Sequence, residues 1–225
     1  METSLLKKVP IFSQLNEEEL EKIRILFVSK KYAKDRIILI EEDPGNSMFL
    51  IQKGRVKVSR MSDDGREVIL SILESGGFFG EMSLLDGKAR SASVTALEDS
   101  QVLILRRGDF LKLMEDHPQI AIGLLKELAA RIRRSDTQIK SLSLQDAMGR
   151  VASTLVMLAE DHGKAKQNTV EIPRIPLQQD LANMSGTSRE TISRVFKYLE
   201  DEKLIIREGR KVAIPDYKKF RRMFS

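Results

Sequence analysis

Hydrophobic and polar residues alternate in short runs between Val28 and Arg107, and turn residues interrupt these runs at regular intervals. The interruptions are Pro44-Gly45-Asn46, Lys53-Gly54, Asp64-Gly65, Gly76-Gly77 and Asp86-Gly87. Alternation with a period of two is typical of β-strands, and these residue types favour turns. The pattern therefore predicts an all-β roll or barrel. Within it, Arg55–Val58 and Glu67–Leu73 flank the Asp64-Gly65 turn and should form a hairpin.

A short helix is expected before the roll. Asn16 is a favourable N-cap residue, and Glu17, Glu18 and Glu19 follow it directly. Carboxylates are stabilised at the positive end of a helix. We therefore expect Asn16 to cap this helix.

After the roll the hydrophobic period changes from two to about three and a half. The positions of this stripe are spaced 4, 3, 4, 3, 4, 3, and all but the polar Ser135 are apolar: Ala121, Leu125, Leu128, Ile132, Ser135, Ile139 and Leu142. Charged residues flank it: Lys126, Glu127, Arg131, Arg133 and Arg134. One long helix with a narrow apolar stripe needs a partner, and the simplest partner is the same helix of a second chain. The alternative is that the helix packs on its own roll.

The rest of the chain is predicted to form a second domain. A break is expected near Gly149, followed by a helix over Val151–Glu160 and a polar loop over 161–168. We therefore expect an α+β fold with a first domain at 1–116, a linking helix at 117–145 and a second domain at 146–225.

Residues 178–192 have the layout of a helix-turn-helix. Ala182 is small where two helices must approach closely, Gly186 lies where the turn needs a positive φ, and Ile192 and Val195 return to the core. Arg189, Glu190 and Arg194 would project from the first half of the second helix, the part that enters a DNA major groove.

Each of these polar side chains has two interpretations. An arginine can pair with guanine O6 and N7, and Glu190 can accept from cytosine N4. Alternatively, the arginines are solvated surface residues, and Thr187-Ser188-Arg189-Glu190 is a capping box in which Glu190 bonds back to the helix start. The expected DNA-contacting residues of this motif are Thr187, Ser188, Arg189, Glu190 and Arg194.

A β-hairpin is expected after the helix-turn-helix. Leu204–Arg207 and Lys211–Ile214 flank Glu208-Gly209-Arg210. Such a hairpin would form a wing, and Arg210 and Lys211 at its tip would contact phosphates.

The distribution of charge supports DNA binding by the second domain. From 138 to 225 there are 16 Lys and Arg against 11 Asp and Glu, which accounts for the whole net charge of +5. A positive excess in this part favours a phosphate backbone as its partner. The chain has no cysteine and only two histidines, His117 and His162, so we expect no disulfide, metal or haem. It also lacks an apolar run long enough for a membrane span or a signal peptide, so we expect it in the cytoplasm.

The segment 79–92 carries residues suited to a sugar phosphate. Arg90 can fork onto two phosphate oxygens, the Ser91 hydroxyl and backbone amides add neutral donors, and Glu81 can accept from a ribose hydroxyl. Gly80 would let the backbone come close. The alternative is a Gly-Glu turn followed by a surface arginine.

This segment resembles the phosphate-binding cassette of cyclic-nucleotide-binding domains. Together with the long helix and Ser188–Arg194, it makes nearly the whole chain similar to the family of cyclic AMP receptor proteins and fumarate-nitrate regulators, and to its cyclic AMP receptor branch in particular. The resemblance implies a β-roll (double-stranded β-helix) sensor, a dimerisation helix and a winged helix-turn-helix. It also implies a ligand site comprising Leu73, Gly80, Glu81, Met82, Ser83, Arg90, Ser91, Ala92, Ser135 and Asp136.

Asp136 departs from the family pattern. The family usually has serine or threonine there, whereas a carboxylate can accept from an adenine amino group, prefer another base or point to water. The resemblance thus implies a cyclic nucleotide, with cyclic AMP first, as allosteric effector. A different small effector and constitutive DNA binding remain open.

The resemblance further implies a homodimer on palindromic DNA with TGTGA-like half-sites, RNA polymerase as a partner, and no enzymatic activity. Two other classes stay open at this point. A regulatory subunit for a protein partner would have no use for a winged helix-turn-helix. An enzyme acting on cyclic nucleotides would need metal ligands or a general base beside the phosphate.

Overall fold

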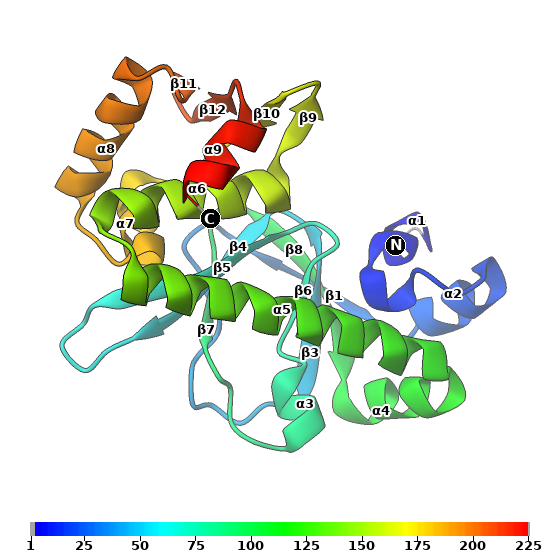
Figure 1. Ribbon diagram of the computed structural model, residues 1–225. Coiled ribbons are helices and arrows are strands. Elements are labelled where there is room, and N and C mark those ends of the chain that lie inside the picture. Colours follow the sequence, from blue (N-terminus) through cyan, green and yellow to red (C-terminus); the bar gives the residue numbers. More distant parts are fainter. Residues whose placement is uncertain (1–2, 225) are drawn as a thin grey trace. The chain divides into compact units, whose positions relative to one another are not determined.

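Short antiparallel strands occupy most of residues 28–106, and helices dominate the remainder of the chain (Figure 1). The computed structural model describes residues 3–224. The chain divides into two units, one ending at Arg133 and the other beginning at Arg134. Both strands and helices are present in each unit, which confirms the predicted α+β class.

The first unit contains the expected roll. Its elements are α1 (Thr3–Lys8), a 3-10 turn (Pro10–Phe12), α2 (Glu17–Arg24), β1 (Val28–Tyr32), β2 (Ile37–Leu39), β3 (Ser47–Lys53), β4 (Arg55–Met61), β5 (Glu67–Glu74), β6 (Phe78–Phe79), α3 (Met82–Asp86), β7 (Ser93–Ala96), β8 (Ser100–Arg106), α4 (Arg107–Asp116) and the first part of α5 (Pro118–Leu144). The strands form two antiparallel four-stranded sheets, ordered β1-β8-β3-β6 and β2-β7-β4-β5.

The predicted hairpin is confirmed by the pairing of β4 with β5. Their register runs from Arg55 opposite Glu74 to Met61 opposite Glu67, with a shift after Val58. Such an irregularity bends the strand pair locally, as the curvature of a roll requires.

Two apolar clusters hold the roll together. One lies among its strands, where the rings of Phe49 and Phe79 stack with centroids 5.1 Å apart. The other packs the helices against the first sheet and includes Phe12, Phe78 and Phe110, which are all fully or almost fully buried. Burial of several aromatic rings in each cluster stabilises the unit, because each removes a large apolar area from water.

The second unit places helices around a small sheet. It contains the rest of α5, then α6 (Ala147–His162), β9 (Lys164–Lys166), β10 (Thr169–Ile172), α7 (Gln178–Ser185), α8 (Arg189–Asp201), β11 (Ile206–Glu208), β12 (Lys211–Ile214) and α9 (Tyr217–Phe224). The strand order is β11-β12-β10-β9. Figure 1 shows α9, in red, against α6.

Three sequence-based expectations about helix limits were wrong. His117 does not begin the long helix but ends the unexpected α4, because Pro118 occupies the first position of α5. The break falls at Gln145 and Asp146 rather than near Gly149, since the Asp146 carboxylate caps α6 by accepting from the Gly149 amide at 2.8 Å. The expected loop at 161–168 contains the end of α6 and strand β9.

Part of the apolar stripe of the long helix is exposed, whereas Leu128 is half-buried against the helical cluster of the first unit. Leu125, Ile132 and Ile139 are between 61% and 66% exposed in the single chain. Large aliphatic side chains at this spacing rarely stay in water. No helix within residues 3–224 combines the length and apolar character that a membrane span requires.

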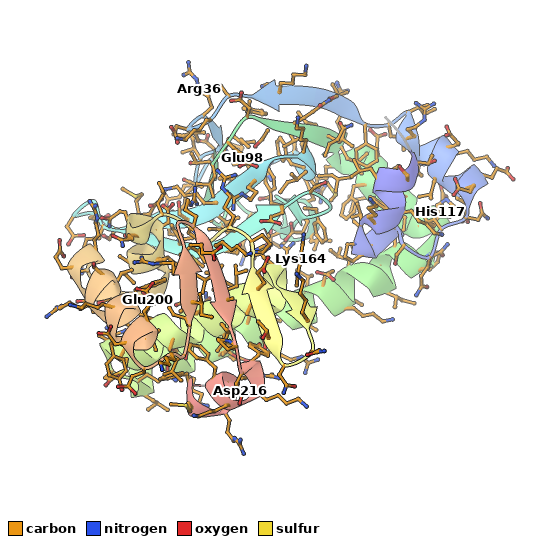
Figure 2. The ribbon with its side chains drawn as sticks, turned by 90° about the horizontal axis from the view of Figure 1, so that it is seen from above. Arg36, Glu98, His117, Lys164, Glu200 and Asp216 are labelled. Carbon is orange, nitrogen blue, oxygen red and sulfur yellow. The ribbon has the colours of Figure 1, made fainter. Side chains whose placement is uncertain are left out.

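The N-terminal helix starts as expected. The Asn16 side chain accepts from the Glu19 amide at 2.9 Å, and the Glu19 carboxylate accepts from the Asn16 amide at 2.7 Å. Figure 2 shows His117 close to this part of the chain, and its Nδ1 lies 3.3 Å from Glu19 Oε1. The predicted cap at Asn16 is confirmed.

We expect Asn16→Ala to lower the free energy of unfolding of the first unit by about 1 kcal/mol, because the Glu19 amide loses its acceptor. Asn16→Ser should restore most of the loss, since serine is an equivalent cap. Urea unfolding followed by circular dichroism measures both variants. Equal losses in the two would contradict a capping role.

Candidate functional site

The backbone of residues 78–93 forms a compact turn and helix between two strands. β6 ends at Phe79, α3 covers Met82–Asp86, and β7 begins at Ser93. Gly80 has a φ of +81°, and a Cβ there would lie 2.9 Å from Nη1 of Arg90. Both the left-handed backbone and the lack of space require glycine. Arg90 is the nearest group to this backbone, and a close approach of a ligand to Gly80 stays a prediction.

Arg90 is buried in the roll, with only 6% of its surface exposed. Its Nη1 donates to the Gly80 carbonyl and its Nη2 to the Ser47 carbonyl, each at 2.8 Å. Its own backbone is fixed by a 2.9 Å bond to the Asp43 carbonyl. Burial lowers the pKa of the guanidinium, and the nearby Glu81 carboxylate opposes that shift. The alternative of a surface arginine is therefore wrong.

Glu81 is the second buried charge, with 1% of its surface exposed. Its Oε1 accepts from Nη1 of Arg131 at 2.9 Å. Arg131 also donates from Nη2 to the Phe78 carbonyl at 2.8 Å, and its guanidinium lies 4.6 Å from the centre of the Phe78 ring. α5 thus supplies the counter-ion for a carboxylate of the roll.

Two of these buried groups have a polar atom without a partner. Nε of Arg90 and Oε2 of Glu81 are both shielded from water and make no hydrogen bond to the described residues. Buried donors and acceptors are normally satisfied, so such atoms need an explanation. An anion beside Arg90 would supply the missing acceptor, and a hydroxyl beside Glu81 would supply the missing donor. Residues of this chain therefore fit a sugar phosphate.

The remaining predicted ligand residues differ in their surroundings. Ala92 and Ser83 are buried, and the Ser83 hydroxyl donates to the Ala89 carbonyl at 3.5 Å. Ser91 and Met82 are exposed and touch each other, with Oγ 3.5 Å from Sδ. Leu73 packs against the apolar cluster of the roll.

Ser135 and Asp136 belong to the second unit, where both are exposed on α5. Their contact with a ligand stays a prediction.

The helix-turn-helix has the predicted form. α7 ends at Ser185 and is capped by Gly186, whose φ of +59° is left-handed and whose amide donates to the Ala182 carbonyl. Ala182 and Ile192 are fully buried, and Val195 is 8% exposed. Small and apolar residues therefore sit where the sequence required them. Arg189, Glu190 and Arg194 are exposed on α8, as reading DNA bases demands.

The start of α8 differs from the capping box considered above. Ser188, not Thr187, is the N-cap, and its hydroxyl accepts from the Thr191 amide at 3.2 Å. Glu190 is thereby the second residue of the helix and lies outside the box position. Its pKa is lowered by hydrogen bonds from its own amide and from the Ser188 hydroxyl. The carboxylate is thus ionised at neutral pH and can act as an acceptor.

Arg150 on α6 was missed by sequence reasoning. Its Nε donates to the Ser185 carbonyl at 3.0 Å and its Nη2 to the Gly186 carbonyl at 3.2 Å. The bonds satisfy carbonyl groups at the end of α7, which have no partner within that helix. Nothing in the spacing of the chain indicates this role, because the two partners lie 35 and 36 residues away.

The wing residues already have partners within the unit. Nε and Nη2 of Arg210 donate to the Ile175 carbonyl at 2.9 and 2.6 Å. Nζ of Lys211 lies 3.0 Å from Oε2 of Glu171, a contact that raises the pKa of the lysine. The hairpin itself is confirmed, whereas phosphate contact by these two residues stays a prediction.

No candidate metal site is present among residues 3–224. No group of three or more histidine and acidic side chains there is arranged to hold an ion.

We expect Arg131→Met to destabilise the first unit by about 3 kcal/mol, because it leaves the buried Glu81 carboxylate without its counter-ion. Combining it with Glu81→Gln should recover part of the loss, since the buried carboxylate that lacks a counter-ion is then removed. Lys126→Met, an exposed position on the same helix, is the control and should change stability by less than about 0.5 kcal/mol. Urea unfolding measures the free energy of unfolding of the single and double variants. If the losses from the two substitutions simply added, the pairing of Arg131 with Glu81 would be contradicted.

Comparison with known proteins identifies the type of both domains. Residues 29–117 match the family model of the cyclic nucleotide-binding domain, and residues 149–223 match that of the Crp-like helix-turn-helix domain. The chain is 36% identical over 200 residues to the cyclic AMP receptor protein of Thermus thermophilus, covering 89% of each protein. It is 34% identical over 188 residues to the cAMP-activated global transcriptional regulator CRP of Haemophilus influenzae, covering 81% of each.

Among solved structures, a mutant of CooA from Carboxydothermus hydrogenoformans superposes with a TM-score of 0.80 at 26% identity, covering 94% of each chain. These relatives are transcription regulators, and both family models cover the parts of the chain that hold the two sites. The chain thus combines a cyclic nucleotide-binding domain, which includes Arg90 and Glu81, with a Crp-like helix-turn-helix domain, which includes α8. The chain belongs to the family of cyclic AMP receptor proteins and fumarate-nitrate regulators.

Proposed function

We propose that this regulator is a homodimer that binds cyclic AMP in its roll and then binds a palindromic DNA site. The observation that carries the proposal is the pair of unsatisfied atoms in the roll, Nε of Arg90 and Oε2 of Glu81. A cyclic ribonucleotide matches both, because its phosphodiester is an anion and its ribose carries a 2′-hydroxyl. Deoxyribonucleotides lack that hydroxyl and would bind more weakly.

Cyclic AMP is the first candidate for the base. The Thermus thermophilus and Haemophilus influenzae relatives are named for cyclic AMP. Ser135 and Asp136 are the residues proposed to meet the purine, and an aspartate can accept from the adenine amino group. A different cyclic nucleotide is the second candidate, and Asp136 is the residue that would select it.

The exposed stripe of α5 supports the dimer. Leu125, Ile132 and Ile139 recur at heptad spacing, and the identical stripe of a second chain would cover them as a coiled coil. Two-fold symmetry of such a dimer would be matched by palindromic DNA, with half-sites about 34 Å apart. RNA polymerase is the proposed protein partner, because regulators of transcription act on its recruitment or exclusion.

Nucleotide binding is proposed to shift an equilibrium between two arrangements of the DNA-reading helices. A ligand shifts such an equilibrium only by its difference in affinity for the two states. Changing the active fraction from about 1% to about 99% requires about 5.5 kcal/mol, summed over the two sites of the dimer. Arg90 and Glu81 would supply this difference at the phosphate and ribose, and Ser135 at the base.

We expect Arg90→Leu to weaken cyclic AMP binding at least about 100-fold, since charge-assisted hydrogen bonds contribute about 1.5–3 kcal/mol each. Calorimetric titration with cyclic AMP, cyclic GMP and a cyclic dinucleotide measures binding and identifies the base. Arg36→Leu, an exposed arginine of the same unit labelled in Figure 2, is the control. Arg90→Leu should remain a dimer by light scattering. If nucleotide still fully stimulated the DNA binding of Arg90→Leu, the proposal would be refuted.

For DNA, we expect Arg189→Ala to cost about 1–3 kcal/mol and to relax the preference at one guanine of each TGTGA-like half-site. Lys211→Ala should instead weaken binding to all sequences alike, as loss of a phosphate contact does. Selection from a pool of random DNA duplexes, followed by titration of the enriched sequences, distinguishes a lost base preference from a general loss of affinity. Enrichment of an unrelated consensus by the unaltered protein would refute the assignment of bases.

A further inference from the structure

Gln145 lies at the two-residue junction between α5 and α6, where three parts of the second unit meet. We propose that Gln145 is a positioning residue that fixes the helix-turn-helix relative to the end of α5, and that α9 locks it in place. The inference adds a role for α9 and for the junction, and its consequence for DNA rests on the proposed function.

The side chain of Gln145 uses both of its polar ends. Its Oε1 accepts from the Ser141 hydroxyl at 2.6 Å, one turn earlier on α5. Its Nε2 donates to the Phe224 carbonyl at 3.1 Å, in the last turn of α9. The amide group therefore joins α5 to α9 across 79 residues of sequence.

Ser153 closes this cluster from α6. Its hydroxyl lies 2.8 Å from Oε1 of Gln145 and 2.5 Å from the Phe224 carbonyl. A hydroxyl has one proton, so it donates to one of these acceptors at a time. Either choice keeps α5, α6 and α9 connected, because Nε2 of Gln145 continues to donate to Phe224.

The main chain of Gln145 reaches the DNA-reading motif. Its carbonyl accepts from Nη1 of Arg150 at 3.1 Å. The same guanidinium holds the carbonyls of Ser185 and Gly186 at the turn between α7 and α8. A single planar side chain thus connects the junction to that turn, and its fork geometry leaves little freedom between them.

The position of the Phe224 carbonyl is itself well determined. α9 packs on α6, its Phe220 is buried, and the ring centroids of Phe224 and Phe220 lie 4.9 Å apart. The Asp216 carboxylate, labelled in Figure 2, accepts from the Lys219 amide at 3.0 Å at the start of α9. Arg221 pairs with Glu160 of α6 at 3.1 Å. α9 therefore acts as a strap from α6 back to the junction.

These contacts suit a positioning role better than a general stabilising one. The junction has only two residues outside helices, and each backbone link could otherwise rotate about φ and ψ. Gln145 ties the end of α5 to α6, α9 and, through Arg150, the α7–α8 turn. A dimer that reads two half-sites needs this geometry, because an error at the junction would displace α8 from its groove.

The test uses Gln145→Glu in the full-length protein. A glutamate keeps an acceptor for Ser141 and Ser153 but cannot donate to the Phe224 carbonyl. Hydrogen exchange of peptides covering 141–153 should become about fivefold faster, which corresponds to the loss of one net hydrogen bond. The unaltered protein should prefer one spacing between the two half-sites of a palindrome over a spacing that is one base pair longer. In Gln145→Glu, the ratio of the two binding affinities should be about fivefold smaller.

Matched controls distinguish the loss of the contacts at Gln145 from the effect of an added negative charge and from the effect of removing a hydroxyl. Gln167→Glu makes the same charge change at an exposed position of the same unit and should leave both readouts unchanged. Ser153→Ala should accelerate exchange at 141–153, whereas Ser143→Ala, on the exposed surface of α5, should not.

Unchanged exchange in Gln145→Glu would overturn the proposal. Faster exchange with full spacing discrimination would also overturn it, since the junction would then be rigid without positioning α8. If the unaltered protein bound no palindrome, the proposed function would fail, and the exchange measurement alone would decide whether α9 locks the junction.

Discussion

The burial of two opposite charges in the roll is the constraint on which the first unit depends. Taking Arg90 and Glu81 out of water is costly unless each is surrounded by groups that complement its charge. The roll meets this requirement with carbonyls from Ser47 and Gly80 and with the guanidinium of Arg131. These partners come from β3, from the turn before α3 and from α5. The site thereby joins segments that lie far apart in the sequence.

The same requirement gives α5 a double role. One side of this helix contributes Arg131, which neutralises Glu81 and covers the Phe78 ring. Its stripe of Leu125, Ile132 and Ile139 remains exposed in the single chain. A ligand that changed the bonding of Glu81 would therefore act directly on a residue of the helix that carries this stripe.

In the second unit, hydrogen bonds to backbone carbonyls connect the α5–α6 junction to α9 and to the helix-turn-helix. Arg150 and Gln145 both bind carbonyl oxygens at helix ends, where these oxygens lack partners within their own helix. The DNA-reading helix α8 is thus presented by a frame of satisfied helix termini. Arg189, Glu190 and Arg194 lie on its exposed face.

Local patterns in the sequence determined most of the fold and the chemical character of both sites. The period of two specified the roll and its β4–β5 hairpin, the heptad spacing specified the long helix, and Gly186 with Ala182 specified the helix-turn-helix. These features were predictable because each depends on neighbouring residues. Tertiary structure alone decided that Arg131, which looks like a solvated flank of the stripe, pairs with Glu81 50 residues away. It also decided that Arg150 and α9 meet at Gln145, because long-range hydrogen bonds to backbone carbonyls involve no residue pattern that a sequence could display.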